Sequence, residues 1–197
     1  HDDRVCSYPA MTALGESKDE LSTVVVVLAD KEEIGSEGAT GMQCGIFSDL
    51  VDMLAASQGV PASVVRANSK CLSADVTAGF DPNFAGVFEK RNSSIVSCGT
   101  ALCKFTGAGG KSGSSDASAE LVGYVRRIFE KAKVNWQMAE LGKVDAGGGG
   151  TVAKYIAKLN IDTIDIGVPV ISMHAPYEVI SKADLYSTYE AFAAFIG

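Results

Sequence analysis

Apolar positions in this chain alternate between short continuous runs and residues at helical spacing. The run 22–29 (STVVVVLA) is rich in β-branched residues, which is typical of a central strand buried on both faces. Further strands are predicted at 64–74, 95–105, 136–141, 163–168 and 170–173. Helices are predicted at 5–14, 46–55, 152–159 and 183–196, and another after Asp116 as N-cap, with Leu121, Val125 and Phe129 facing inward. Strands alternating with helices indicate a layered α/β fold with a mostly parallel central sheet.

The pattern contains no internal repeat and no linker, so we expect residues 1–197 to form a single domain. The longest apolar run, 23–29, is far shorter than the roughly 18 to 20 residues of a membrane span. We therefore expect no membrane partner. The chain opens on His1-Asp2-Asp3-Arg4 without an initiator Met, and we interpret it as a fragment of a longer protein.

Composition and charge indicate which partners and which cell compartment to expect. Of 197 residues 47% are hydrophobic, which is enough for one core, and 24 acidic residues against 17 basic ones give a net charge of −7. No cluster of Lys and Arg stands out, so a nucleic acid is not an expected partner. The five cysteines are scattered without a Cys-x-x-Cys motif, which favours reduced, buried thiols in a cytoplasmic protein.

Two adjacent carboxylates follow the predicted strand 22–29, in the motif Asp30-Lys31-Glu32-Glu33-Ile34-Gly35-Ser36. Ligands of open α/β sheets bind just beyond the carboxyl ends of strands. One carboxylate of such a pair can bind a metal ion while its neighbour accepts a proton from metal-bound water. The alternative is an ordinary solvated acidic loop.

Other potential metal ligands stand beside regular elements. Asp75 follows a predicted strand, His174 ends another, and Asp2 and Asp3 precede the first predicted helix. Asp2, Asp3 and His174 also have simpler explanations, because helix starts favour acids and a His in an apolar run is often a hydrogen-bonded core residue. Together, carboxylates and one imidazole suit zinc, manganese or cobalt.

Two glycine-rich segments are candidates for ligand binding, and we reject one of them. Residues 107–112 (GAGGKS) resemble a phosphate-binding loop, but only two residues separate Gly107 from the Gly-Lys pair where the motif requires four, so we reject nucleotide binding. Residues 147–151 (GGGGT) precede a predicted helix, and their backbone N–H groups can receive a carbonyl or carboxylate. The alternative for this run is a flexible connector.

The motifs above occur in an order that resembles a known family. Asp2-Asp3-Arg4-Val5-Cys6, the stretch 30–43 (DKEEIGSEGATGMQ), Ser73-Ala74-Asp75, Asp81-Pro82-Asn83 and Ser172-Met173-His174 follow one another along the chain. In this respect the chain resembles the M18 metalloaminopeptidases, which include aspartyl aminopeptidase and aminopeptidase I, from His1 to Gly197. The resemblance implies a zinc-exopeptidase-like α/β/α fold and a peptide substrate.

The resemblance also implies roles for individual residues. Asp2 corresponds to the carboxylate that bridges two zinc ions and is followed by a cis peptide bond to Asp3. Glu33 and His174 correspond to the remaining protein ligands of one zinc ion, and Asp75 to a ligand of the other. Glu32 corresponds to the general base that activates water and passes the proton to the leaving amine.

Substrate contacts are implied as well. Gly149, Gly150 and Thr151 match the family's substrate-contacting turn. Lys104 lies close to the position where aspartyl aminopeptidases keep a lysine for an acidic side chain at P1, the substrate's N-terminal residue, with Cys103 as the competing match. The resemblance thus implies release of acidic or neutral N-terminal residues.

Two parts of the family pattern have no counterpart in the sequence. These are the His-x-Asp segment, which carries the first zinc histidine, and the inserted dimerisation domain. The chain therefore resembles the C-terminal part of a catalytic domain, from an enzyme that forms homo-oligomers. The alternative is a catalytically incomplete fragment that acts only as a metal-binding or assembly module.

Overall fold

The structure, a computed structural model, describes residues 1–19 and 21–197. Its helices are α1 (Arg4–Glu16), α2 (Ile46–Ser57), α3 (Ala62–Asn68), α4 (Ala119–Ala132), α5 (Ala153–Ala157) and α6 (Lys182–Ile196), with the 3₁₀ helices η1 (Glu32–Ile34) and η2 (Pro82–Val87). Its strands are β1 (Lys70–Ala74), β2 (Thr77–Ala78), β3 (Thr100–Cys103), β4 (Phe105–Ala108), β5 (Ser112–Asp116), β6 (Trp136–Met138), β7 (Asp162–Gly167), β8 (Pro169–Ile171) and β9 (Val179–Ile180).

The main sheet has the strand order β1-β7-β3-β6. β1 runs parallel to β7 and β3 parallel to β6, whereas β3 and β7 are antiparallel. Two of its three pairings are therefore parallel, which confirms the predicted α/β fold with a mostly parallel sheet. A second small sheet, β2-β8-β9, continues from the ends of β1 and β7.

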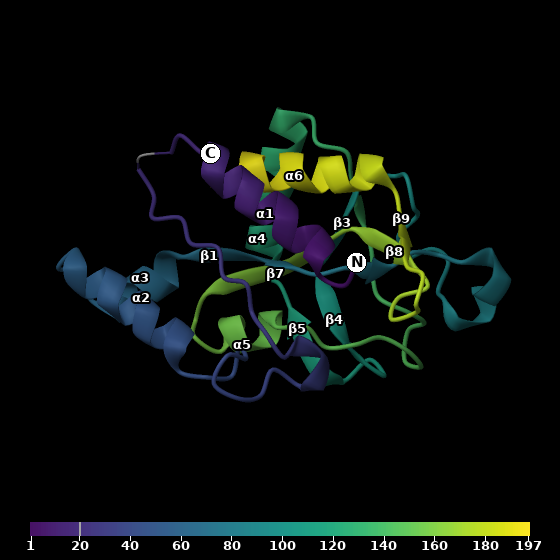
Figure 1. Ribbon diagram of the computed structural model, residues 1–197, viewed down its shortest axis with the longest axis horizontal. Helices are drawn as coiled ribbons and strands as arrows, with labels where there is room; N and C mark the ends of the chain where they lie inside the picture. Colours follow the sequence, from purple (N-terminus) through teal and green to yellow (C-terminus); the bar gives the residue numbers. More distant parts are fainter. Residues whose placement is uncertain (20) are drawn as a thin grey trace.

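Helices α1, α4 and α6 cover one face of the main sheet, and α5 lies on the other (Figure 1). The core on the first face includes Leu121, Val125 and Phe129, which repeat at four-residue intervals along α4 and are almost fully buried. Ser118 begins this helix, because its hydroxyl accepts a hydrogen bond from the N–H of Leu121 at 3.1 Å. The predicted N-cap at Asp116 is therefore wrong, and Asp116 ends β5 instead.

The predicted central strand at 22–29 is also wrong. These residues form no strand, and Val25, Val27 and Leu28 are 43%, 43% and 58% exposed. A strand requires a neighbouring backbone to pair with, and within the described residues no strand pairs with this run. Helix α2 forms as predicted, yet of its residues only Ala55 is buried.

Two further predicted strands are shorter than expected. Residues 64–74 divide into α3 and β1, because the chain turns into a helix after Pro61, whose carbonyl accepts from the N–H groups of Val64 and Val65. Of residues 95–105, only Thr100–Cys103 and Phe105 are in strands. The preceding turn holds Gly99 at φ +97°, where a Cβ would lie 2.3 Å from the Asn135 carbonyl oxygen.

The glycine- and serine-rich segment after Cys103 forms the hairpin β4–β5. It does not open a helix as a phosphate-binding loop does, in agreement with the spacing argument. The run 147–150 packs against this hairpin: the Gly109 N–H donates to the Gly147 carbonyl at 2.8 Å, and a Cβ on Gly148 would lie 2.1 Å from the Gly107 oxygen. Glycine is thus required there by close backbone approach.

All five cysteines are free thiols, and Cys6 and Cys103 are buried. Cys98 is exposed, so the expectation that every thiol is buried is wrong. Among the described residues, no helix is long and apolar enough to cross a membrane. The single-domain organisation and the cytoplasmic location stay predictions.

Candidate metal centre

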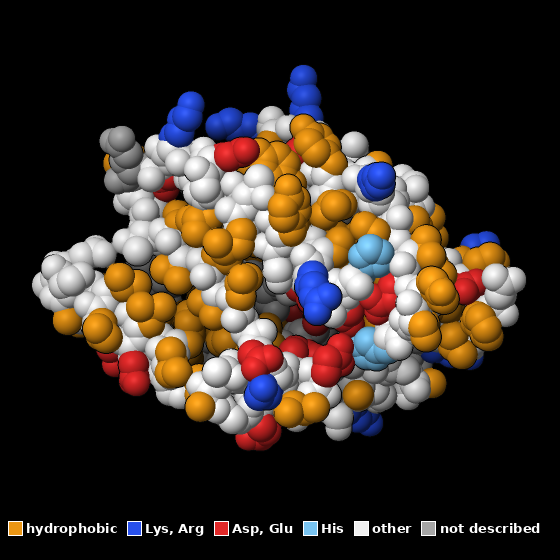
Figure 2. Space-filling model, in the orientation of Figure 1, with side chains coloured by type: hydrophobic (Ala, Val, Ile, Leu, Met, Phe, Trp, Pro, Cys, Tyr) orange, Lys and Arg blue, Asp and Glu red, His pale blue; other side chains and the backbone are white. Residues whose placement is uncertain are grey.

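Four elements far apart in the sequence bring acidic side chains and one imidazole together. Asp2 and Asp3 stand just before α1, Glu33 lies in η1, Asp75 follows β1, and His174 follows β8. Asp and Glu side chains gather at the centre of one face, beside His side chains (Figure 2). The predicted ligands Asp2, Glu33, Asp75 and His174 all belong to the two clusters formed here.

The first cluster consists of Asp2, Glu33 and His174, whose ligand atoms lie within 4.8 Å of one another. The Nε2 atom of His174 is 3.0 Å from Asp2 Oδ2 and 3.0 Å from Glu33 Oε1. Two carboxylates and an imidazole are a donor set that zinc accepts. The three side chains implied for one zinc ion are therefore adjacent.

The second cluster consists of Asp2, Asp3 and Asp75 within the same 4.8 Å limit. Asp2 belongs to both clusters, as a bridging ligand would. Asp3, a potential ligand to which the resemblance assigned no role, joins this cluster. The peptide bond between Asp2 and Asp3 is cis, as the resemblance implied.

The electrostatics of the second cluster favour a bound cation. Burial, with the charges of Asp3 and Asp2, raises the pKa of Asp75 to about 9. Burial also raises the pKa of Asp3 to about 7, although a hydrogen bond with Cys6 lowers it. The Oδ1 atom of Asp3 is buried without a hydrogen-bond partner. Crowded carboxylates with an unpartnered oxygen fit a divalent metal ion, whose charge would offset their repulsion.

Glu32 differs from these ligands because it belongs to neither cluster. It is half-buried, and its pKa is raised by burial and by the charges of Glu33 and Asp2. Burial and Asp2 likewise raise the pKa of Glu33. Burial alone would lower the pKa of His174, but the charges of Glu33 and Asp2 raise it overall. Glu32 is thus a carboxylate beside the clusters that is free to exchange a proton.

Glu178, which the sequence analysis missed, connects two of the metal-ligand candidates. Its carboxylate accepts hydrogen bonds from the backbone N–H of Asp2 at 3.1 Å and of His174 at 2.6 Å. A carboxylate that bridges two backbone segments fixes their relative position. No local sequence signal marks Glu178, because Asp2 lies 176 residues away.

A cavity of about 280 Å³ adjoins Glu32 and is lined in part by Gly150, Thr151 and Lys154. Gly150 and Thr151, two of the three residues implied as substrate contacts in this turn, line the cavity with Glu32, whereas Gly149 is not among the lining residues. Lys104 is not among them either; its Nζ atom lies 2.5 Å from Asp116 Oδ1, and both side chains are exposed. The lysine at this cavity is Lys154, which sequence reasoning missed.

Residues 1–196 match the family described as "Aminopeptidase I zinc metalloprotease (M18)". The chain belongs to this family.

Known relatives agree with this assignment. The chain is 46% identical over 199 residues to the probable M18 family aminopeptidase 1 of Clostridium acetobutylicum, and the match covers 99% of this chain but 43% of the relative. The crystal structure of aminopeptidase I from Clostridium acetobutylicum superposes with a TM-score of 0.92 at 47% identity, covering 100% of this chain and 43% of that one. The mApe1 dodecamer of Saccharomyces cerevisiae has a TM-score of 0.79 at 26% identity, covering 98% and 44%. The chain thus spans less than half the length of these relatives.

Proposed function

We propose that the protein is an aminopeptidase that releases acidic or neutral N-terminal residues from peptides with the help of two zinc ions. The observation that carries the proposal is the pair of clusters that share Asp2, with Glu32 beside them. Asp2, Glu33 and His174 would hold one ion, and Asp2, Asp3 and Asp75 the other. Manganese or cobalt would suit the same oxygen-rich donors.

Zinc ions bound at such a site supply Lewis acidity, which lowers the pKa of a water molecule and polarises a carbonyl. Glu32 accepts the proton of the attacking water at its carboxylate and delivers it to the amine of the leaving peptide. Glu32 lines the cavity and belongs to neither cluster, so its carboxylate is available for proton transfer. Gly150 and Thr151 border the cavity beside Glu32, where they orient the substrate backbone.

A second candidate function is a metal-binding or assembly module without turnover. It is favoured by the make-up of the second cluster, in which the described residues supply only carboxylates and no imidazole. Self-assembly in either case is supported by the dodecamer of the related mApe1. Light scattering should then give a mass that is a multiple of 20.5 kDa, and a monomer would argue against self-assembly of this chain.

The two functions are separated by measuring zinc and turnover on the purified 197-residue chain. The peptidase should contain close to two zinc ions per chain by elemental analysis and should hydrolyse aminoacyl-p-nitroanilides. Glu32→Gln should keep its zinc and lose roughly 10²- to 10⁴-fold in kcat, the usual contribution of a general base. One zinc ion or none, without turnover, would favour the module.

The matched control is Glu37→Gln on the same loop, where Glu37 contacts the Gln43 side chain and belongs to neither cluster. This variant should retain its activity. If Glu32→Gln kept most of the activity of the unaltered chain, the assignment of the general base would be wrong.

A further inference from the structure

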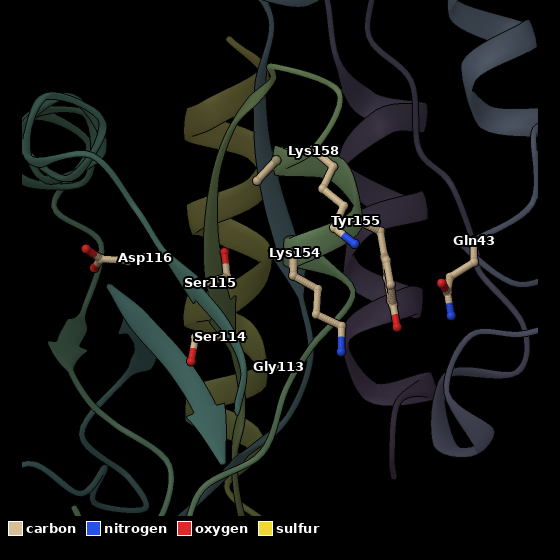
Figure 3. Close-up of a pocket in the computed structure, with 9 residues that line it drawn as sticks. Gln43, Gly113, Ser114, Ser115, Asp116, Lys154, Tyr155 and Lys158 are labelled. Atoms are coloured by element: carbon tan, nitrogen blue, oxygen red, sulfur yellow. The ribbon is translucent and has the colours of Figure 1, made fainter. Parts of the chain in front are cut away.

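A second, larger cavity continues from the one beside Glu32. It measures about 640 Å³ and lies between α5 and β5, where Lys154 and Lys158 line it with Tyr155 (Figure 3). The two cavities share Gly113, Lys154 and Tyr155. Together they form one groove, which leads from the candidate base to the end of α5.

The groove brings two lysines, Lys154 and Lys158, together with two carboxylates, Glu32 and Asp116. The Nζ atoms of Lys154 and Lys158 lie 4.8 Å and 5.7 Å from the centre of the Tyr155 ring. Asp116, the acidic residue that lines this part, forms an ion pair with Lys104. Among the ion pairs of the described residues, none within 4 Å involves either groove lysine. Their charges are therefore available to a ligand.

Two like charges four residues apart repel each other on a helix. Holding them near one aromatic ring costs free energy unless something negative binds between them. The ring faces of tyrosine attract cations, which offsets part of the repulsion but adds no negative charge. An anion in the groove would offset the rest.

The position of Lys154 connects this charge with the substrate loop. A Cβ on either Gly113 or Gly150 would lie 3.3 Å from its Nζ atom, so the ammonium group sits between the β4–β5 hairpin and the glycine run. The lysine is partly buried, which strengthens its attraction for an anion. The charge of Lys154 also lowers the pKa of Glu32, although burial, which is the larger effect, raises that pKa.

We propose that Lys154, supported by Lys158, binds a carboxylate group of the peptide substrate. The inference rests on the proposed function, because it treats the groove as a peptide site. A peptide offers this chemistry from two sources: an acidic side chain and the C-terminal carboxylate of a short peptide. Both place a negative oxygen within reach of an ammonium group that forms no ion pair within 4 Å among the described residues.

The test compares matched peptides on the metal-free chain, since carboxylates would also bind zinc. Asp-Ala-amide and Asn-Ala-amide differ in the charge of one side chain, and Ala-Ala and Ala-Ala-amide in the charge of the C-terminus. Dissociation constants are measured by NMR titration. At least one pair should bind with roughly tenfold selectivity for the carboxylate, and the pair that does identifies the source. Equal affinities within both pairs would overturn the proposal.

Lys154→Met should abolish this selectivity and Lys158→Met should reduce it. The matched control, Lys131→Met, removes an exposed lysine on α4 and should leave it unchanged. Persistent selectivity in a folded Lys154→Met chain would contradict the assignment. If that variant does not fold, the rate of acetylation of Lys154 is measured in the unaltered chain. The preferred carboxylate peptide should slow the acetylation of Lys154 relative to the matching amide peptide, whereas Lys131 should react at the same rate with both peptides. Equal acetylation rates of Lys154 with both peptides would also overturn the proposal.

This experiment separates the two proposals. Loss of selectivity with zinc binding and turnover intact would remove the carboxylate site and leave the aminopeptidase. Selectivity in a chain that binds no zinc would leave a carboxylate site and remove the peptidase.

Discussion

The crowded carboxylates of the second cluster predict an unusual stability profile for the metal-free chain. The pKa of Asp75 rises from 3.8 to about 9 in the folded state, so over that interval the folded chain keeps a proton that the unfolded chain releases. The free energy of unfolding must then fall as pH rises. Asp3, with a pKa raised to about 7, acts in the same direction. Ion-paired carboxylates, whose pKa is lowered on folding, give the opposite trend, and only below about pH 5.

The size of the effect follows from proton linkage. One fully linked proton changes the free energy of unfolding by about 1.4 kcal/mol per pH unit. The linked proton of Asp75 alone should therefore lower the free energy of unfolding by about 3 kcal/mol between about pH 5 and pH 7. Asp75→Asn, which keeps the shape without the charge, should make the metal-free chain more stable near pH 7 while weakening its affinity for zinc. Few substitutions at a binding site act in these two directions.

The assay is urea unfolding of the chain in chelator at several pH values, repeated with excess zinc. Zinc at 100 times its dissociation constant should stabilise the unaltered chain by about 2.7 kcal/mol, and Asp75→Asn by less. The control is Asp49→Asn, an exposed carboxylate on α2, which should keep the slope of the unaltered chain. A stability that is constant or increases with pH would refute the reasoning, as would an unchanged slope in Asp75→Asn.

Three other substitutions test the fold and the site. Phe129→Ala should lower the free energy of unfolding, measured with urea, by about 3 to 5 kcal/mol, because the ring is fully buried against Trp136. A loss under about 1 kcal/mol would contradict that packing. Asp184→Asn should lower the free energy of unfolding by about 1 to 3 kcal/mol in the same assay. The buried carboxylate accepts hydrogen bonds from the N–H groups of Ser97 and Gly99 at 2.7 Å each, whereas an amide offers only one oxygen. An unchanged free energy of unfolding would exclude that role. His174→Ala should weaken zinc binding at least roughly tenfold in a chelator competition, and unchanged affinity would exclude it as a ligand.

Local patterns predicted those parts of the fold that depend on neighbouring residues. Helix α4 follows from apolar residues at four-residue intervals, and α1, α2 and α6 from similar spacing. The run 22–29 shows the limit, because its apolar character was evident but a strand exists only where another backbone pairs with it. The hairpin β4–β5 was missed for the same reason, since three of the five residues of β5 are serines, which no apolar pattern marks as a strand.

The candidate metal centre, too, could be predicted from the sequence only in part. The side-chain types of Asp2, Glu33, Asp75 and His174 marked them as potential ligands, and the motifs around them carried the resemblance to the family. Glu178 as a bridge and Lys154 at the groove emerged only from contacts, as did the grouping of Asp3 with Asp2 and Asp75. Asp2 and His174 are 172 residues apart, yet their side chains lie 3.0 Å from each other. The raised pKa values depend on burial and on such neighbours, which only the folded chain creates.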